Sequence, residues 1–196
     1  MTPDQTATRW LLLIYRVPQE PAGRRTYVWR QLKQLGAVYL QQAAAILPDQ
    51  PEPRRALHDL AKRIREFEGE VSLLETASPS AEWGENLVGQ FNQARNAEYA
   101  EVVDNVERFE DEVRRESRKD KFNFAQLEDI EADWEKLQRW HERLRARDFF
   151  AAPGRVSASE ALERGGAALE TFTAAVYARE NVHGVHGNEE AHGAES

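Results

Sequence analysis

The sequence has no cysteine and no long hydrophobic run. The first absence excludes disulfides, thiolate chemistry and zinc sites built on sulfur, and it fits a reducing cytoplasm. No stretch approaches the ~18 consecutive apolar residues of a membrane-spanning helix, so we expect no contact with a membrane. The first residues, Met1–Gln5, lack the basic segment of a secretory signal peptide. The chain is therefore predicted to be cytoplasmic.

Recognisable catalytic motifs are also missing. The chain contains no glycine-rich phosphate loop, no nucleophile elbow and no His-Glu-x-x-His pair. We therefore predict no catalytic residue and no cofactor, and we favour binding over enzymatic activity.

Charge is unevenly distributed over the 196 residues. Residues 1–78 hold 11 Lys and Arg against 9 Asp and Glu, whereas residues 79–196 hold 15 against 25. The net charge of −8 thus comes from the second part. An acidic protein does not bind polyanions indiscriminately, so any contact with nucleic acid or an oxyanion is expected from the first part.

The first part has the pattern of a small sheet domain. An unbroken apolar run from Trp10 to Val17 predicts a strand buried on both faces. Helical spacing follows over 24–35, ended by Gly36, then two short strands over 37–41 and 43–47. Pro51 and Pro53 open a second helix reaching residue 68, with Gly69 ending it before a last strand over 70–75. This order, β-α-β-β-α-β, predicts an α+β, ferredoxin-like domain over residues 9–77.

Long helices follow in the second part. Helical periodicity predicts a first helix over 81–117, and Asn123 with Gln126 predicts a capping box opening a second helix to residue 147. Ser157 with Glu160 predicts another capping box, opening a last helix to about residue 179. We expect an antiparallel three-helix domain over 78–180 and a disordered tail over 181–196.

Five basic residues of the first part form the main candidate site. Two of them lie in the first turn of a predicted helix, where backbone N–H groups favour anions, and guanidinium groups suit phosphate and tetrahedral chromate alike. A solvated basic face pairing with the acidic helices is the alternative. The predicted anion- or nucleic-acid-binding residues are Arg16, Arg24, Arg25, Arg30 and Lys33.

Arg95 and Glu98 interrupt the apolar stripe of the first long helix. Buried charges are paired or functional, and an i,i+3 pair can satisfy itself. The pair is thus either structural or, with Tyr99, part of a pocket between the sheet domain and the helices.

Histidines are few, and we predict no metal site. His141 lies on an apolar stripe without a second histidine in helical register, which indicates a packed side chain. Three more lie in the predicted tail, where a selective site is not expected: His183, His186 and His192.

Several separated motifs resemble the amino-terminal part of the chromate-resistance regulator family ChrB. They occur in the family's order over residues 10–180: Trp10–Pro18, Arg25, Trp29–Gln41, Leu47–Pro48, Gln90–Tyr99, Lys121–Glu128, Arg147–Phe150 and Pro153–Arg155. The resemblance implies a part in chromate or oxyanion stress, with transcriptional control as the family's proposed role. Full-length members of that family carry a further carboxy-terminal domain.

The sheet domain is more distantly similar to the middle domain of the phenylacetate repressor PaaX and to a small CRISPR-associated ferredoxin-like nuclease. In that nuclease group an aspartate ends the first strand as the proposed metal ligand, whereas here Arg16 follows Tyr15. A cation cannot replace a carboxylate on a hard divalent metal, so nuclease chemistry is not expected.

We therefore expect a regulatory or accessory protein of chromate or oxyanion stress that binds DNA or a tetrahedral oxyanion such as chromate. An enzyme or small-anion-binding protein, and a protein–protein interaction module, are the alternatives. A homodimer is compatible with the sequence.

Overall fold

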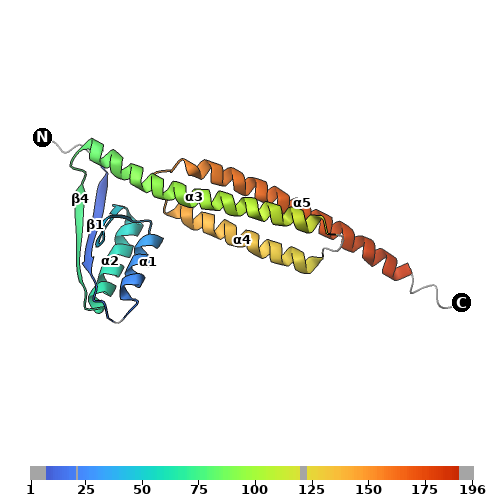
Figure 1. The fold of residues 1–196 in the computed structure, drawn as a ribbon, viewed down its shortest axis with the longest axis horizontal. Coiled ribbons are helices and arrows are strands. Elements are labelled where there is room, and N and C mark those ends of the chain that lie inside the picture. Colours follow the sequence, from blue (N-terminus) through green and yellow to red (C-terminus); the bar gives the residue numbers. More distant parts are fainter. Residues whose placement is uncertain (1–7, 21, 120–122, 190–196) are drawn as a thin grey trace. The chain divides into compact units, whose positions relative to one another are not determined.

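The computed structural model describes residues 8–20, 22–119 and 123–189. Its residues fall into two compact units, which are described separately below. The sheet unit comprises Met1–Arg95 and Ala146–Ala152, and the helical unit comprises Asn96–Arg145 and Pro153–Ser196. The fold is α+β, as predicted, with a ferredoxin-like element order followed by long helices (Figure 1).

The sheet unit contains a four-stranded antiparallel sheet in the order β2-β3-β1-β4. Its elements follow the predicted β-α-β-β-α-β order: β1 (Arg9–Arg16), α1 (Arg24–Gln34), β2 (Val38–Gln41), β3 (Ala44–Pro48), α2 (Pro51–Glu66) and β4 (Glu70–Ala77). Both helices lie on one side of the sheet (Figure 1). Strand β1 is central in the sheet, because it pairs with β3 on one edge and with β4 on the other.

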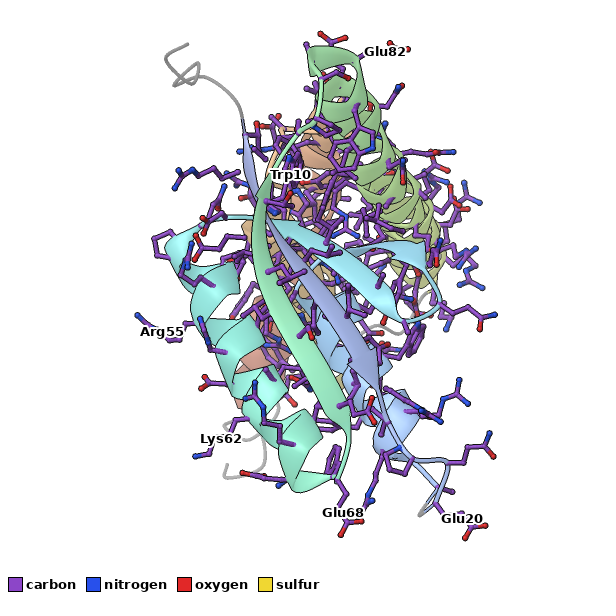
Figure 2. All side chains as sticks on the ribbon, turned by 90° about the vertical axis from the view of Figure 1, so that its left-hand side faces the viewer. Trp10, Glu20, Arg55, Lys62, Glu68 and Glu82 are labelled. Atoms are coloured by element: carbon purple, nitrogen blue, oxygen red, sulfur yellow. The ribbon has the colours of Figure 1, made fainter. Side chains whose placement is uncertain are left out.

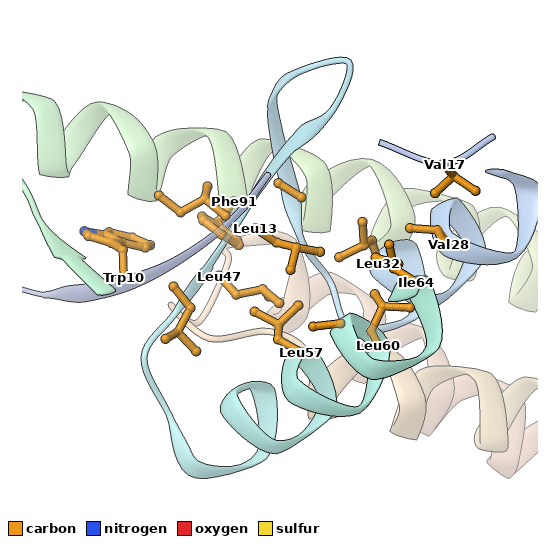
Figure 3. Packing of buried hydrophobic residues seen from close by; sticks show 14 of the residues in the cluster. Trp10, Leu13, Val17, Val28, Leu32, Leu47, Leu57, Leu60, Ile64 and Phe91 are labelled. Carbon is orange, nitrogen blue, oxygen red and sulfur yellow. The ribbon is translucent and has the colours of Figure 1, made fainter. Parts of the chain in front are cut away.

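The core of the sheet unit lies between β1, β3 and the two helices. Leu11 and Leu13 of β1 are fully buried in one cluster with side chains of α1 and α2 (Figure 3). Along β1 the buried cluster extends from Trp10, on the other face of the sheet, to Val17 (Figure 3). The cluster also contains Val28, Leu32, Leu47, Leu57 and Ile64.

The expectation that β1 is buried on both faces is wrong for its second half. Ile14 is 43% exposed, and Leu74, on the same face of neighbouring β4, is 49% exposed. Alternation places Trp10 on that face too, yet Trp10 is fully buried because the rings of Phe91 and Phe150 cover it at centroid distances of 5.7 and 5.8 Å. Helices α1 and α2 cover only the opposite face.

The sheet unit extends past the expected domain boundary at residue 77. Helix α3 (Ala81–Ser117) contributes Leu87 and Phe91 to the core, and Phe149 and Phe150 return to it from a distant part of the chain. The ring of Phe91 stacks on that of Trp10, and the rings of Phe149 and Phe150 meet the Phe91 ring edge to face.

Two neighbouring residues shape the turn after α2, Glu68 and Gly69, whereas the sequence indicated only the glycine. Glu68, rather than Gly69, takes the left-handed backbone conformation, with φ of 60°. Gly69 is needed because a Cβ atom there would lie 2.6 Å from the carbonyl oxygen of Arg16. The glycine thus permits the close approach of β1 and the start of β4.

The helical unit is built from the part of α3 after Arg95, from α4 (Phe124–Ala146) and from α5 (Gly154–Glu189), which run alongside one another in alternating directions (Figure 1). Its core holds Tyr99, Val106, Trp134 and Phe172. The reciprocal bonds of the predicted capping box are present at α4, since the amide of Asn123 donates to Gln126 Oε1 (3.0 Å) and the amide of Gln126 donates to Asn123 Oδ1 (3.2 Å).

The start and end of α5 differ from the prediction. Ser157 lies inside the helix, which begins at Gly154, where the backbone amide donates to Asn96 Oδ1 (2.7 Å). The helix continues to Glu189, so residues 181–189 are helical where a disordered tail was expected, and residues 190–196 lie outside the described part.

Candidate anion-binding site

A cavity of about 630 Å³ opens at the carboxyl end of β1, within the sheet unit. The end of β1 and the loop after it form one wall, the first turns of α1 form a second, and β2 with the β2–β3 turn forms a third. The sheet order brings these segments together, since β3 pairs with β1 and carries the hairpin beside Tyr15, whose amide donates to the carbonyl oxygen of Ala43 (3.0 Å). The lining residues that matter chemically are Tyr15, Arg16, Arg25, Thr26, Trp29, Tyr39 and Gln42.

The cavity carries positive charge without a compensating carboxylate. Arg16 and Arg25 are its charged lining residues, and no Asp or Glu of the described residues lines it. Among the described residues, neither arginine makes an ion pair. The adjoining amino terminus of α1 has Gly23 as its cap, without a side-chain hydrogen bond and with no acidic residue in the first turn. Both features favour a bound anion.

Two tyrosines lie in contact inside the cavity. The hydroxyl oxygens of Tyr15 and Tyr39 are 3.2 Å apart, so one of them donates its proton to the other. Burial, reinforced by the bond to Tyr15, raises the pKa of Tyr39 well above its ordinary value. Tyr39 therefore stays protonated, and the hydroxyl that accepts within the pair can donate a hydrogen bond to a ligand.

Trp29 presents an indole ring at the mouth of the cavity. The residue is 47% exposed, although tryptophan is mostly buried in soluble proteins. The ammonium group of Lys33 lies 5.3 Å from its ring centroid, which is within cation–π range. A second hollow of about 460 Å³ shares Arg25, Trp29, Tyr39 and Gln42 with the cavity.

The five predicted basic residues thus have different surroundings. Arg16 and Arg25 line the cavity. Lys33 does not line it, but its ammonium group lies over the ring of Trp29, which does. Arg24 instead holds the end of α2, since its Nη1 donates to the carbonyl oxygen of Phe67 (2.8 Å) and its guanidinium lies over the Phe67 ring. Arg30 is exposed and lines neither hollow.

The second predicted group lies on α3. Arg95 belongs to the sheet unit and is buried beside the turn after α1, where a Cβ atom on Gly36 would lie 2.8 Å from its Nη1. Arg147 adjoins the same turn, and its Nη1 donates to the carbonyl oxygen of Lys33 (2.8 Å). Glu98, half-buried, and Tyr99, fully buried, belong to the helical unit. The proposed Arg95–Glu98 pair and the pocket with Tyr99 stay predictions.

His141 is buried in the helical unit, with its ring centroid 6.0 Å from that of Tyr99. Burial, then the charges of Arg145 and Arg155, lowers its pKa below the ordinary histidine value, against a smaller opposite effect of Glu142. No three His, Cys, Asp or Glu residues of the described ranges form a group suited to a metal ion. The side chains of His183 and His186, and all of His192, lie outside the described part.

Of the chemically relevant lining residues, sequence reasoning missed five: Tyr15, Thr26, Trp29, Tyr39 and Gln42. One signal was available, because Trp29 lies off the helical stripe formed by Val28 and Leu32. A tryptophan outside the buried stripe of an amphipathic helix indicates a binding surface. The tyrosines and the glutamine gave no comparable signal.

No helix in the described part of the chain is both long and apolar enough to span a membrane.

Comparison with known proteins gives one consistent result. The family model described as "Protein ChrB, N-terminal" matches residues 25–183. Protein ChrB of Cupriavidus metallidurans (strain ATCC 43123 / DSM 2839 / NBRC 102507 / CH34) is 32% identical over 99 residues, which are 50% of this chain and 30% of that protein. The match thus covers less than a third of that relative, and no solved structure matches significantly. The cavity and the buried aromatic cluster described above are therefore features of a chain that belongs to the ChrB amino-terminal family.

Proposed function

We propose that this chain is a regulatory protein of chromate or oxyanion stress that acts by binding an anion in the cavity at Arg16 and Arg25. One observation carries the proposal: two arginines line a cavity of about 630 Å³, and no carboxylate in the part of the chain that the structure describes lines it. Such a site attracts anions even in a protein whose net charge is −8. Membership of the ChrB amino-terminal family supports the regulatory role.

The chemistry of the cavity favours binding over catalysis. Among the described residues, its lining offers guanidinium, phenol, hydroxyl, amide and indole groups, but no carboxylate, histidine or cysteine. General acid–base catalysis near neutral pH needs a group that exchanges its proton there, and the raised pKa of Tyr39 keeps that phenol protonated. The groups present donate hydrogen bonds and carry charge, as an anion receptor requires.

The test is thermal unfolding of the full chain with chromate, sulfate and phosphate at constant ionic strength. A ligand that binds only the folded state stabilises it by about 2.7 kcal/mol at 100 times its dissociation constant, so at least one of these anions should raise Tm. Arg25→Gln should abolish most of that rise.

Arg55→Gln is the matched control. It removes the same charge from an exposed position on α2, and Arg55 points away from the sheet and lines no part of the cavity (Figure 2). Its anion-dependent rise in Tm should equal that of the unmodified protein. Two results would contradict an anion site in this cavity. One is a Tm that none of the three anions changes, and the other is a rise in Tm that Arg25→Gln and Arg55→Gln reduce equally.

DNA is a second candidate ligand. The observation that favours it is the exposed run of Arg25, Arg30 and Lys33 along α1, next to the cavity. Phosphate contacts from one helix face can anchor a duplex backbone without reading its sequence.

A further inference from the structure

The cavity at Arg16 and Arg25 is far larger than a tetrahedral oxyanion. Such an anion has about five heavy atoms and displaces roughly two or three waters, on the order of 60–90 Å³ at ~30 Å³ for each water. The cavity measures about 630 Å³, which lies within the ~300–1,000 Å³ of sites for larger organic ligands. An oxyanion alone would leave most of it filled with water.

The lining of the cavity divides into a charged part and an aromatic part. Arg16 and Arg25 supply the charge, whereas Trp29 supplies a broad, half-exposed ring shared with the second hollow. Lys33 lies over one face of that ring, and a planar ring has a second face. Indole and guanidinium planes are the surfaces on which proteins stack nucleobases.

The remaining polar groups suit the edge of a heterocycle. The side chain of Gln42 offers both hydrogen-bond donors and an acceptor, and it lines both hollows. The Tyr15–Tyr39 pair holds one further hydroxyl proton. A bare oxyanion would use only donors, so an amide acceptor in the wall indicates a ligand that also donates hydrogen bonds.

We propose that this cavity binds a nucleotide, with its phosphate held by Arg16 and Arg25 and its base stacked on Trp29. The inference rests on the proposed anion-binding function of the same cavity and names the class of ligand. Two sources share this chemistry, a free mononucleotide and the phosphorylated end of a single strand.

The experiment is isothermal titration calorimetry of the full chain with adenosine 5′-monophosphate, ribose 5-phosphate and inorganic phosphate. Base stacking on an aromatic side chain should make the mononucleotide bind roughly 10-fold to 100-fold more tightly than ribose 5-phosphate. A 5′-phosphorylated octathymidylate, compared with the same strand lacking the phosphate, tests the strand end as the source. Tighter binding of either base-bearing ligand than of ribose 5-phosphate supports the proposal and identifies the source.

Variants separate the base from the phosphate. Trp29→Ala should reduce the affinity of the nucleotide to that of ribose 5-phosphate and leave the latter unchanged, whereas Trp29→Phe, which keeps a ring, should retain most of the difference. Arg25→Gln should lower the affinities of the nucleotide and of ribose 5-phosphate by a similar factor. Arg55→Gln should change neither affinity. Unfolding curves of each variant confirm that it is folded.

Two results overturn the inference. One is that neither base-bearing ligand binds more tightly than ribose 5-phosphate, and the other is that Trp29→Ala leaves nucleotide affinity intact. Either result, obtained together with binding of chromate or phosphate that depends on Arg25, leaves the proposed function standing and removes only the nucleotide. If the nucleotide binds and chromate, sulfate and phosphate do not, the inference stands and the inorganic oxyanion is removed as the ligand of the proposed function.

Discussion

At the scale of single residues, His141 shows how an environment fixes a charge state. It is buried in the helical unit, and its Nε2 atom has no hydrogen-bond partner among the described residues. Arg145 and Arg155 add positive charge to the cost of burial and Glu142 opposes them, so the pKa is lowered on balance. The side chain is therefore neutral in the folded protein at pH 7.

This lowered pKa has a consequence for stability. Below about pH 6.5, the ordinary pKa of histidine, the unfolded chain binds a proton at His141 more readily than the folded chain does. The free energy of unfolding should therefore fall as pH decreases from 7.5 towards 5. His141→Leu should flatten this dependence in denaturant titrations, and His58→Gln, at an exposed position on α2, should not. Equal pH profiles for His141→Leu and the unmodified protein would contradict this account.

At the scale of elements, α4 and α5 begin in different ways: α4 is capped by residues next to it in sequence, and α5 by a residue far away in sequence. The Asn123–Gln126 box was predicted correctly because both partners lie within one helical turn. The Ser157–Glu160 box was wrong because Asn96, 58 residues from Gly154 in sequence, accepts the first amide of α5 and starts that helix one turn earlier. A sequence window cannot contain that partner.

Two adjacent glycines in α5 should respond oppositely to alanine. A Cβ atom on Gly165 would lie 2.6 Å from Cζ3 of Trp134 and 3.0 Å from Val106, whereas one on Gly166 would make an ordinary 3.5 Å contact. Alanine in place of glycine otherwise favours a helix by up to about 1 kcal/mol. Gly166→Ala should stabilise the protein by several tenths of a kcal/mol, and Gly165→Ala should destabilise it by about 1–3 kcal/mol. Chemical denaturation measures both, and equal effects would refute the close packing of α5 on Trp134.

At the scale of the whole molecule, charge limits how strongly the chain can hold DNA. Residues 79–196 carry 25 acidic against 15 basic residues, so favourable contacts must come from the nearly balanced first part. In that part, Arg24 is engaged with Phe67 and Arg54 is paired with Asp49 and Glu75. Arg16, Arg25, Arg30 and Lys33 then remain of the predicted group.

This count predicts a shallow salt dependence. Each phosphate contact contributes about −0.9 to the slope of log affinity against log salt, so four contacts give a slope no steeper than about −4. Fluorescence anisotropy with a labelled duplex measures it, and replacing Arg25, Arg30 and Lys33 by Gln should bring the slope towards −1. A slope much steeper than −4, or one unchanged in the triple variant, would place the DNA contacts elsewhere.

The sequence by itself determined the elements of this protein and their order. The apolar run at Trp10–Val17, the glycine at position 36 and the prolines at 51 and 53 act on backbone within a few residues, so they can be recognised without the fold. The same holds for α3, whose bounds of Ala81 and Ser117 match the prediction. Family membership, too, was readable from separated motifs and is confirmed by the family model.

Only the tertiary structure decided which residues meet. Nothing in the spacing of Tyr15 and Tyr39, 24 residues apart, predicts that their hydroxyls touch. The sheet order β2-β3-β1-β4 brings them together, because β3 pairs with β1 and carries the hairpin beside it. Packing likewise gave five basic residues that are close in sequence different surroundings: two line a cavity, one holds the end of α2 and two lie on the surface of α1. Burial and pairing distances are properties of the packed chain, and no local signal in the sequence carries them.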